Sequence, residues 1–418
     1  MKSYLISIGD ELLIGQTVNT NAAFIGNKLA DINFDIIRIS IVKDNENDII
    51  EELDLAKEKS DVIIITGGLG PTHDDVTKRT LVKYFNTELI ENPDVLENIK
   101  IMFEKRGRKI TPLNEQQALV PKIAKVISND YGTAPGMWIE HEKKIYIIMP
   151  GVPYEMKPMM ENFVIPELTE IAATEGLLIR RLILQTTGLP ESTLYEKLGN
   201  LNELLGDAEL AFLPSSYGVK LRITVRTGDE ETAKNKLTEI EQKIRSKAGR
   251  YIFARGEERL EETVGRLLKE RDLTISIAES CTGGNISNII TNVAGSSKYF
   301  ERGVVSYSNA AKVEILKVDE DTVTKHGAVS QEVAMQMAEG IKSISGTDIG
   351  LSVTGILGPS GATTDKPVGL IYIGYCDEKV CTASKFYFGN DRLINKQRAT
   401  QAALDILRRN LLGISQDD

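Results

Sequence analysis

The strongest constraint on the fold is the segment of residues 61–66 (DVIIIT), an almost unbroken apolar run of strand-forming residues. Such a run without polar alternation is typical of a strand buried on both faces, as in parallel sheets covered by helices. Three glycines follow within residues 67–70 (GGLG), and a helix is predicted from about Asp75. Ligands of open α/β sheets bind at turns beyond the carboxyl ends of the strands. The segment therefore predicts an α/β domain with a ligand site at its glycine turn.

An alternation of strands and helices extends over the first third of the chain and returns in the last third. The first third contains predicted strands at 3–8 and 34–42 and predicted helices at 20–31 and 47–59. The last third contains an amphipathic helix at 257–270, strands at 273–278 and 303–307, a hairpin over 368–375 and 380–388, and a final helix from about residue 391. The middle contains strands at 180–187 and 219–226 and helices at 191–205 and 230–247.

These patterns predict the domain organisation. A chain of 418 residues exceeds what one core normally serves. The expected fold class is α/β, with two three-layer α/β domains flanking a small α+β, KH-like module. The predicted domains are residues 1–172, 173–252 and 253–418.

Charge and composition exclude several classes of function. The net charge of −10 argues against a general nucleic-acid or membrane-surface binder. The last predicted helix of the module ends in several basic residues, but no G-x-x-G loop, which clamps the nucleic-acid backbone in KH modules, occurs between 177 and 252. We therefore favour a spacer or dimerisation role for the module over RNA binding, and expect no direct nucleic-acid partner.

Cysteine and histidine are scarce. Three cysteines cannot build a disulfide framework or a CxxC metal knuckle, so a cytoplasmic protein is expected. No apolar stretch approaches the ~18 residues of a transmembrane helix, and the N-terminus does not read as a secretory signal. Three histidines are too few for a His-rich metal site. Any chemistry is therefore expected to depend on Asp, Glu, Ser, Thr, Tyr, Lys and backbone amides.

The first candidate site is the segment of residues 66–77 (TGGLGPTHDDVT). Its glycines let a ligand approach the backbone, and the N–H groups at the start of the following helix suit phosphate. Carboxylates beside a phosphate site indicate a divalent cation, because bare carboxylates would repel the ligand. The carboxylates expected at this edge are Asp10, Glu11, Asp44, Asp74 and Asp75. The alternative for Asp74 and Asp75 is a helix start that complements the helix dipole.

The second candidate site is the segment of residues 278–284 (AESCTGG), between a predicted strand and a predicted helix. Its glycines would expose N–H groups as an oxyanion hole or a phosphate cradle. Ser280 needs a base if it is a nucleophile, and Lys312 and Tyr307 are the candidates in 305–312 (VSYSNAAK). A lysine can act as a base when burial lowers its pKa.

Alternatives remain open at this second site. Ser280 could be an N-cap hydroxyl, and Lys312 could lie on a solvated helix face. Cys281 is a rival nucleophile or a buried, inert residue. A Ser-His-Asp triad is disfavoured, because His326 is the only histidine of this domain and no acid to orient it is evident.

The first site resembles a known family. The 66–77 segment is similar to the molybdopterin-binding (MoaB/MogA-like) fold of molybdenum-cofactor biosynthesis proteins. With GDELLIGQTVNTN (9–21) and PGVPYEM (150–156), it resembles the first domain of the CinA family. The resemblance implies a metal-dependent ADP-ribose pyrophosphatase, with Asp44 and Asp75 as catalytic residues and ligands of a divalent metal of the Mg, Mn or Co class. The implied substrate-binding residues are Asp10, Glu11, Gly67, Gly68, Gly70, Thr72, Gly151 and Pro153.

The second site resembles the other half of that family. The set ESCTGG, SYSNAAK, TGILGP and KPVG is similar to the nicotinamide-nucleotide amidase domain, the C-terminal half of CinA proteins. The resemblance implies hydrolysis of nicotinamide mononucleotide to the acid and ammonia without a cofactor. Ser280 would be the nucleophile and Lys312 the base, with Tyr307 and Thr354 as support. The implied substrate contacts are Cys281, Thr282, Gly283, Gly284, Gly355, Gly358 and Arg392, with Arg398 a further candidate for phosphate.

Three functions are therefore open. The preferred one is a bifunctional, homodimeric hydrolase of pyridine-nucleotide salvage acting on nicotinamide mononucleotide and ADP-ribose. The second is an amidase whose N-terminal domain only binds nucleotide, as a regulatory or interaction module. The third is a non-enzymatic interaction protein. The acidic net charge argues against one form of this function, direct binding of DNA.

Overall fold

The computed structural model describes residues 1–70, 76–105, 107–172 and 178–415. Three residues singled out at the first candidate site, Thr72, Asp74 and Asp75, lie outside these ranges. The chain forms two compact units, residues 1–180 with 226–233 and residues 181–225 with 234–418. Within the described residues, no helix has both the length and the apolar character needed to cross a membrane.

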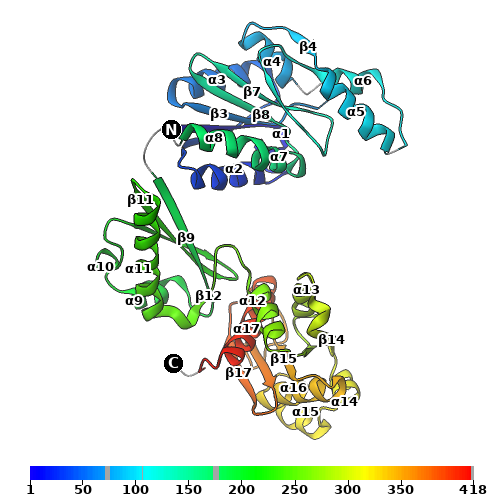
Figure 1. Cartoon of the computed structure of the whole chain (residues 1–418). Helices are drawn as coiled ribbons and strands as arrows, with labels where there is room; N and C mark the ends of the chain where they lie inside the picture. The colour runs from blue at the N-terminus through cyan, green and yellow to red at the C-terminus, as the bar shows by residue number, and fades with distance from the viewer. Residues whose placement is uncertain (71–75, 106, 173–177, 416–418) are drawn as a thin grey trace. The chain divides into compact units, whose positions relative to one another are not determined.

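The N-terminal domain is built on a six-stranded sheet of order β2-β1-β3-β8-β7-β6 (Figure 1). Its first four strands are parallel, and β7 and β6 are antiparallel additions. The sheet strands are β1 Lys2–Ile8, β2 Asp35–Val42, β3 Val62–Thr66, β6 Lys125–Ile127, β7 Gly136–His141 and β8 Lys144–Met149. The helices are α1 Asp10–Leu13, α2 Thr20–Asp31, α3 Glu46–Lys59, α4 Thr77–Tyr84, α5 Pro93–Lys105, α6 Pro112–Glu115, α7 Pro153–Met159 and α8 Ile165–Ala172.

Two apolar cores make this domain three-layered. The β3 segment is buried along its whole length, as the unbroken run at 61–66 predicts. Helix α3 packs on one face of the sheet, where Ile49 and Leu53 are fully buried. Helices α2 and α7 pack on the other face, with Ile25 and Met156 in the core. The predicted α/β class of this domain is confirmed.

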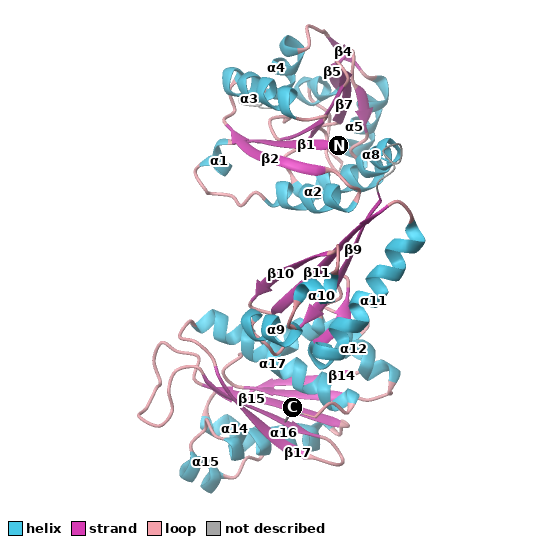
Figure 2. Ribbon diagram, turned by 90° about the vertical axis from the view of Figure 1, so that its left-hand side faces the viewer, coloured by secondary structure: helices cyan, strands magenta, loops and turns pink. Residues whose placement is uncertain are grey.

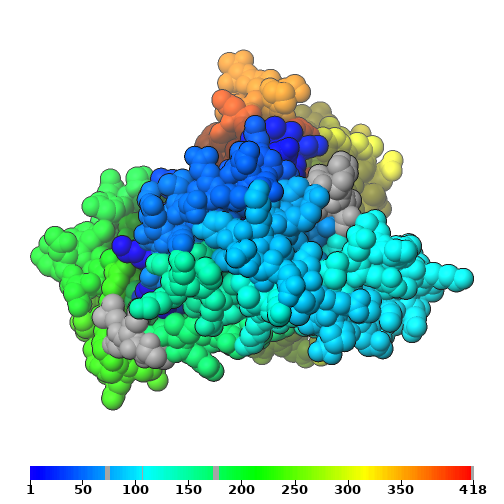
Figure 3. Space-filling view, turned by 90° about the horizontal axis from the view of Figure 1, so that it is seen from above, coloured from blue at the N-terminus to red at the C-terminus, as the bar shows by residue number. Residues whose placement is uncertain are grey.

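One segment of the domain was not predicted from the sequence. Between α4 and β6, the chain forms a two-stranded ribbon of β4 (Leu89–Glu91) and β5 (Leu119–Pro121), together with α5 and α6. Figures 1 and 3 show α5 and α6 standing out from the body of the domain.

The module forms a four-stranded sheet of order β10-β11-β9-β12. Its strands are β9 Leu178–Thr186, β10 Glu209–Ser215, β11 Gly218–Thr227 and β12 Ile252–Arg255, and its helices are α9 Glu191–Leu198, α10 Leu201–Leu205 and α11 Glu230–Ala248. The prediction of one helix over 191–205 was wrong. Gly199 adopts a positive φ of 74° after α9, and the Asn200 side chain caps α10, so the helix breaks there. Strands β10 and β12 were also missed.

The C-terminal domain is a second three-layer sandwich, on a five-stranded sheet of order β14-β13-β15-β16-β17. Its strands are β13 Ile275–Glu279, β14 Phe300–Val305, β15 Ile349–Gly355, β16 Leu370–Cys376 and β17 Cys381–Tyr387. Its helices are α12 Leu260–Glu270, α13 Asn285–Thr291, α14 Asn309–Leu316, α15 Glu320–His326, α16 Gln331–Ser345 and α17 Arg392–Leu412. Helices α12 and α17 cover one face of the sheet, and α14, α15 and α16 cover the other (Figure 2). Helix α13 packs into the same core as α12 and α17.

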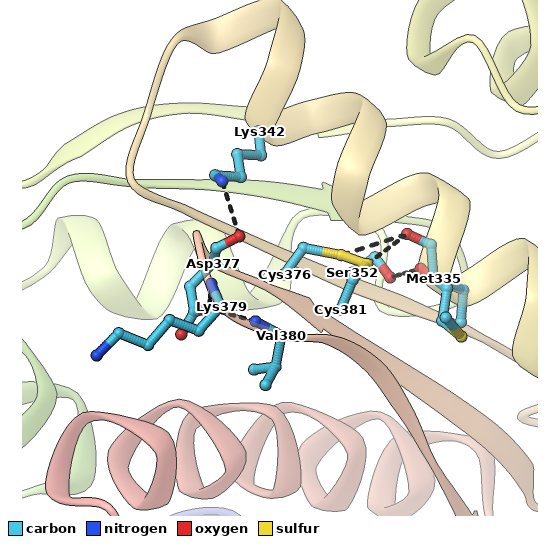
Figure 4. Close-up of a disulfide and its surroundings, with 9 residues drawn as sticks. Met335, Lys342, Ser352, Cys376, Asp377, Lys379, Val380 and Cys381 are labelled. Atoms are coloured by element: carbon cyan, nitrogen blue, oxygen red, sulfur yellow. Dashed lines mark hydrogen bonds between the residues drawn. A yellow bond between two sulfur atoms is a disulfide. The ribbon is translucent and has the colours of Figure 1, made fainter.

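The predicted hairpin of this domain is present and carries a disulfide. Strands β16 and β17 pair in register up to Cys376 and Cys381, which face each other with Cα atoms 4.0 Å apart and are joined by a disulfide (Figure 4). The count of three cysteines gave no signal for this bridge, because it depends on the hairpin register. The turn is fixed by Asp377, whose carboxylate accepts the backbone N–H groups of Lys379 and Val380.

Candidate functional site

Ser280 lies at the carboxyl edge of the C-terminal sheet, immediately after β13. Its N–H donates to the Val353 carbonyl of β15, and the Glu279 carbonyl accepts the N–H of Ser306 after β14. Neighbouring strands on both sides therefore hold the backbone around Ser280. The residue is 8% exposed, so it lies in a nearly buried position that still reaches solvent.

Lys312 reaches this serine from α14, whose N-terminus is capped by the Ser308 side chain. The Lys312 Nζ lies 3.1 Å from Ser280 Oγ, 2.8 Å from the Ser306 carbonyl and 3.5 Å from the Tyr307 carbonyl. The side chain is buried, and burial lowers the pKa of Lys312, because the charged form loses hydration. The structure thus places Lys312 on the serine rather than on a solvated helix face.

Nζ is placed to donate to all three partners, and a neutral amine at this place would keep one lone pair for the Ser280 hydroxyl. A neutral lysine has two N–H donors and one lone pair, and two carbonyl oxygens lie within reach of those donors. The lone pair is then left for the third partner, the Ser280 hydroxyl. This is the arrangement of a base that accepts a proton from a serine nucleophile.

Two of the four backbone amides in the turn after Ser280 are already engaged. The N–H of Gly283 donates to the Ser280 carbonyl, and the N–H of Gly284 donates to the Glu279 carboxylate. Among the described residues, no oxygen accepts the N–H of Cys281 or Thr282. These two N–H groups, which lie beside the Cys281 thiol, are therefore the candidate oxyanion donors of the turn.

Cys281 is a poor rival to Ser280. The thiol is buried, and burial raises its pKa to about 12. The thiolate, which is the nucleophilic form, is therefore scarce near neutral pH. The burial favours an inert Cys281.

Tyr307 and Arg392 lie together at the mouth of the site. The Arg392 guanidinium donates to the Gly358 carbonyl at 2.7 Å and to the Tyr307 hydroxyl at 3.4 Å. The Tyr307 side chain is exposed, and its carbonyl, not its hydroxyl, is what reaches Lys312.

The hydroxyl of Thr354 is directed elsewhere. It donates to the Ala328 carbonyl at 2.8 Å, and the following Gly355 packs against Ile371 and the Leu370 carbonyl. Both residues therefore hold β15 in place, and no described hydrogen bond joins the Thr354 side chain to Ser280 or Lys312.

The structure adds Lys396 and Asn395 to the residues proposed from the sequence. The Lys396 ammonium lies 3.7 Å from the position that a Cβ on Gly283 would take, and it has no ion-pair partner in the described part of the chain. Asn395 is fully buried and donates to the carbonyls of Leu357 and Gly389, which ties α17 to the loop after β15. The spacing of Lys396 four residues after Arg392 could have indicated that both lie on one helix face. Arg398 is exposed.

At the first candidate site, the glycine turn after β3 is tightly enclosed. Gly67 has a φ of 108°, and a Cβ on it would lie 2.2 Å from the Ile8 carbonyl oxygen. Gly151 packs on Gly67, where its own Cβ would lie 3.3 Å from the Gly67 Cα. Gly68 also has a positive φ, of 65°. Only glycine fits such positions without strain, so the turn brings bare backbone to the sheet edge.

Asp44 is the carboxylate that the structure places at this turn. Its Oδ1 lies 3.6 Å from the position of a Cβ on Gly68, and its Oδ2 accepts the N–H of Asp10 at 3.1 Å. The side chain is half-buried. A carboxylate beside bare backbone suits a hard cation. Asp75, its predicted partner, lies outside the described residues, and no cluster of three possible metal ligands occurs among the described ones.

The other predicted residues line the same edge. Glu11 is exposed, and its carboxylate folds back over Gly9. Pro153 begins α7 directly after the turn that holds Gly151, and Gly70 ends the described part of the glycine turn.

Comparison with known proteins decides the family. Three family models match in succession: a probable molybdopterin binding domain over residues 4–170, the damage-inducible protein CinA KH domain over 181–254 and the CinA C-terminal domain over 257–411. A putative competence-damage inducible protein of Caldicellulosiruptor saccharolyticus is 44% identical over 99% of this chain and all of that protein. The chain belongs to the CinA family.

A second full-length relative agrees with this assignment. A CinA-like protein of Kosmotoga olearia is also 44% identical over 99% of this chain and its own full length. The crystal structure of a competence/damage inducible protein from Agrobacterium tumefaciens is 35% identical, covers 37% of this chain and 93% of that chain, and has a TM-score of 0.36. These names describe a family of competence- or damage-inducible proteins and state no reaction.

Proposed function

We propose that the C-terminal domain of this CinA-family chain hydrolyses the carboxamide of nicotinamide mononucleotide, releasing nicotinate mononucleotide and ammonia. The observation that carries the proposal is the buried Lys312 Nζ at 3.1 Å from Ser280 Oγ, with two carbonyl acceptors for its N–H groups. A serine with a lysine base is suited to acyl transfer from an amide. The choice of nicotinamide mononucleotide as substrate comes from the family resemblance.

The residues supply each proton transfer. Ser280 Oγ attacks the carboxamide carbon, and Lys312 Nζ takes the hydroxyl proton. The N–H groups of Cys281 and Thr282 stabilise the negative charge on the carbonyl oxygen. Lys312 then gives its proton to the departing amine, which leaves as ammonia. Water then attacks the resulting ester while Lys312 takes its proton, and Lys312 passes that proton to Ser280 Oγ as the ester C–O bond breaks, which releases the acid and free Ser280.

The experiment that tests the proposal is an assay of the full chain for ammonia release from nicotinamide mononucleotide, with and without EDTA. We expect release in both conditions, since no step requires a metal. An active protein stopped by EDTA would contradict the mechanism, and an inactive one would contradict the substrate.

The pH dependence follows from the lowered pKa of Lys312. The neutral amine is the active form, so kcat/KM should rise with pH and level off below the ordinary lysine pKa of about 10.4. A profile from pH 6 to 10.5 measures the inflection, and Lys312→Arg, whose guanidinium stays charged, should lose the activity at every pH. A profile that is flat or falls with pH would contradict this role.

The phosphate of the substrate is assigned to Lys396, together with Arg392. Lys396→Ala should raise KM for nicotinamide mononucleotide by about 10-fold or more and change kcat little, because a charged hydrogen bond contributes about 1.5–3 kcal/mol. The same variant should change KM much less for the nucleoside without the phosphate. An equal effect on both substrates would remove Lys396 from the phosphate site. Lys298→Ala, at an exposed lysine of the same domain, is the control.

For the N-terminal domain, we propose metal-dependent cleavage of the pyrophosphate of ADP-ribose. The enclosed glycine turn and the Asp44 carboxylate beside it support this function. A divalent cation held by Asp44 and Asp75 would neutralise phosphate charge and activate water. The glycine turn would hold the phosphates through backbone N–H groups. Cleavage of ADP-ribose with Mg, Mn or Co ions, and none with EDTA, is the expected result.

A further inference from the structure

Glu279 is the one residue at the Ser280 turn that carries a buried charge without a part in the proposed chemistry. It is the last residue of β13, its side chain has 0% exposure, and Ser280 follows it directly. The carboxylate accepts four hydrogen bonds: from the N–H groups of Gly284, Ile286 and Ser287 at 3.0, 3.1 and 2.9 Å, and from the Ser287 hydroxyl at 2.7 Å.

These bonds join the two ends of the turn. Glu279 lies before the turn of residues 280–284, and all four donors lie at its end or in the first turn of α13. The backbone of residues 279 and 280 is itself held by Val353 and Ser306 of the neighbouring strand ends. The carboxylate therefore closes a loop whose other end is fixed to the sheet. The conformation of the Ser280 turn then depends on this side chain.

The same bonds decide which anions the turn can bind. The N-terminus of a helix usually attracts anions through free N–H groups and the helix dipole. Here the amides of Gly284, Ile286 and Ser287 are engaged by a carboxylate that already brings negative charge. A phosphate at these three amides would meet a like charge and no free backbone donor. The N–H groups of Cys281 and Thr282 are left to bind an anion. Two such groups beside Ser280 indicate a site for the oxyanion of the reaction rather than for a phosphate.

We propose that Glu279 is a positioning residue for the amidase. It fixes the Ser280 turn so that the N–H groups of Cys281 and Thr282 can donate to the oxyanion. It also excludes the substrate phosphate from the start of α13. This inference rests on the proposed function, because amide hydrolysis is the reaction that its test measures. Glu279 does not touch the substrate in its productive position, so its removal should lower kcat far more than it changes KM.

Glu279→Gln tests the role. The amide keeps the size of the side chain but presents an NH₂ group where the carboxylate accepts hydrogen bonds, so the turn must shift. We expect kcat for ammonia release to fall at least about 30-fold, because complete loss of one oxyanion donor lowers kcat by about 10²–10³, while KM changes less than about threefold. Labelling of Ser280 by a fluorophosphonate probe should slow in parallel with kcat. Circular dichroism checks that the variant is folded.

The matched control is Glu261→Gln, which changes another largely buried glutamate of the same domain, one that lies on α12 beside Arg259. It should keep kcat and the labelling rate within about twofold. Retention of kcat in Glu279→Gln would overturn the proposal. So would a loss of activity that only matches the loss of folded protein, or an equal loss of product affinity, because either indicates a purely structural role.

A second variant decides the matter if Glu279→Gln does not fold. Ser287→Ala removes one of the four hydrogen bonds and leaves the charge in place, so kcat should fall about three- to tenfold with KM unchanged. An unchanged kcat in this variant would overturn the proposal.

The probe separates this inference from the proposed function. If the wild-type chain is labelled at Ser280 but releases no ammonia from nicotinamide mononucleotide, the substrate is wrong, and the labelling rates of Glu279→Gln and Ser287→Ala still test the positioning role. If wild-type Ser280 is not labelled at all, the serine is not activated, and both the inference and the amidase mechanism are overturned.

Discussion

Replacing Ser280 with alanine is expected to reduce ammonia release from nicotinamide mononucleotide by at least about 10³-fold. Loss of a nucleophile removes the covalent route, and only binding and oxyanion stabilisation remain. Lys312→Met should cause a loss of the same order, because the methionine fills the buried space without a base. The double variant should be no worse than either single variant, since the two residues act as one unit.

Steady-state ammonia release and binding of nicotinate mononucleotide measure this prediction. The product should bind to Ser280→Ala with an affinity close to that of the wild type, because loss of the Ser280 hydroxyl affects the chemical step and not the binding of the nucleotide. Ser297→Ala and Lys317→Met change exposed residues of the same domain and serve as controls. Full activity in Ser280→Ala or in Lys312→Met would exclude the serine–lysine mechanism.

Asp44→Asn is expected to lower metal-dependent cleavage of ADP-ribose by about 10²-fold or more. Asparagine keeps the shape of the side chain and can still accept the N–H of Asp10, but it lacks the negative charge that holds a divalent cation. The amidase activity should stay within about twofold, because Ser280 and Lys312 belong to the other compact unit.

Three measurements check the prediction for Asp44. ADP-ribose cleavage with added metal gives the activity, calorimetry with the metal alone gives its affinity, and ammonia release reports on the amidase. Asp94→Asn, at an exposed residue of α5, is the control. If wild-type protein cleaves no ADP-ribose with any divalent metal, a nucleotide-binding N-terminal domain becomes the better interpretation. If Asp44→Asn loses cleavage but binds metal as before, Asp44 is not the ligand.

Secondary structure was predictable where the apolar pattern left one choice. The unbroken run in β3 and the helical spacing in α2 and α3 each match one element of the structure. The apolar pattern failed to predict secondary structure where tertiary contacts or a single backbone angle determine it. The positive φ of Gly199 splits the helix predicted over 191–205, and β10 and β12 are strands only through their pairing partners.

The sequence alone determined the α/β class and the two glycine-rich turns, because periodicity and turn chemistry are local properties, and the family resemblance supplied most of the candidate site residues. Only the tertiary structure decided how these residues meet. Ser280 and Lys312 are 32 positions apart, and their contact depends on the strand order that brings α14 to the end of β13. The lowered pKa of Lys312 and the four hydrogen bonds of Glu279 likewise depend on burial, which local sequence does not encode.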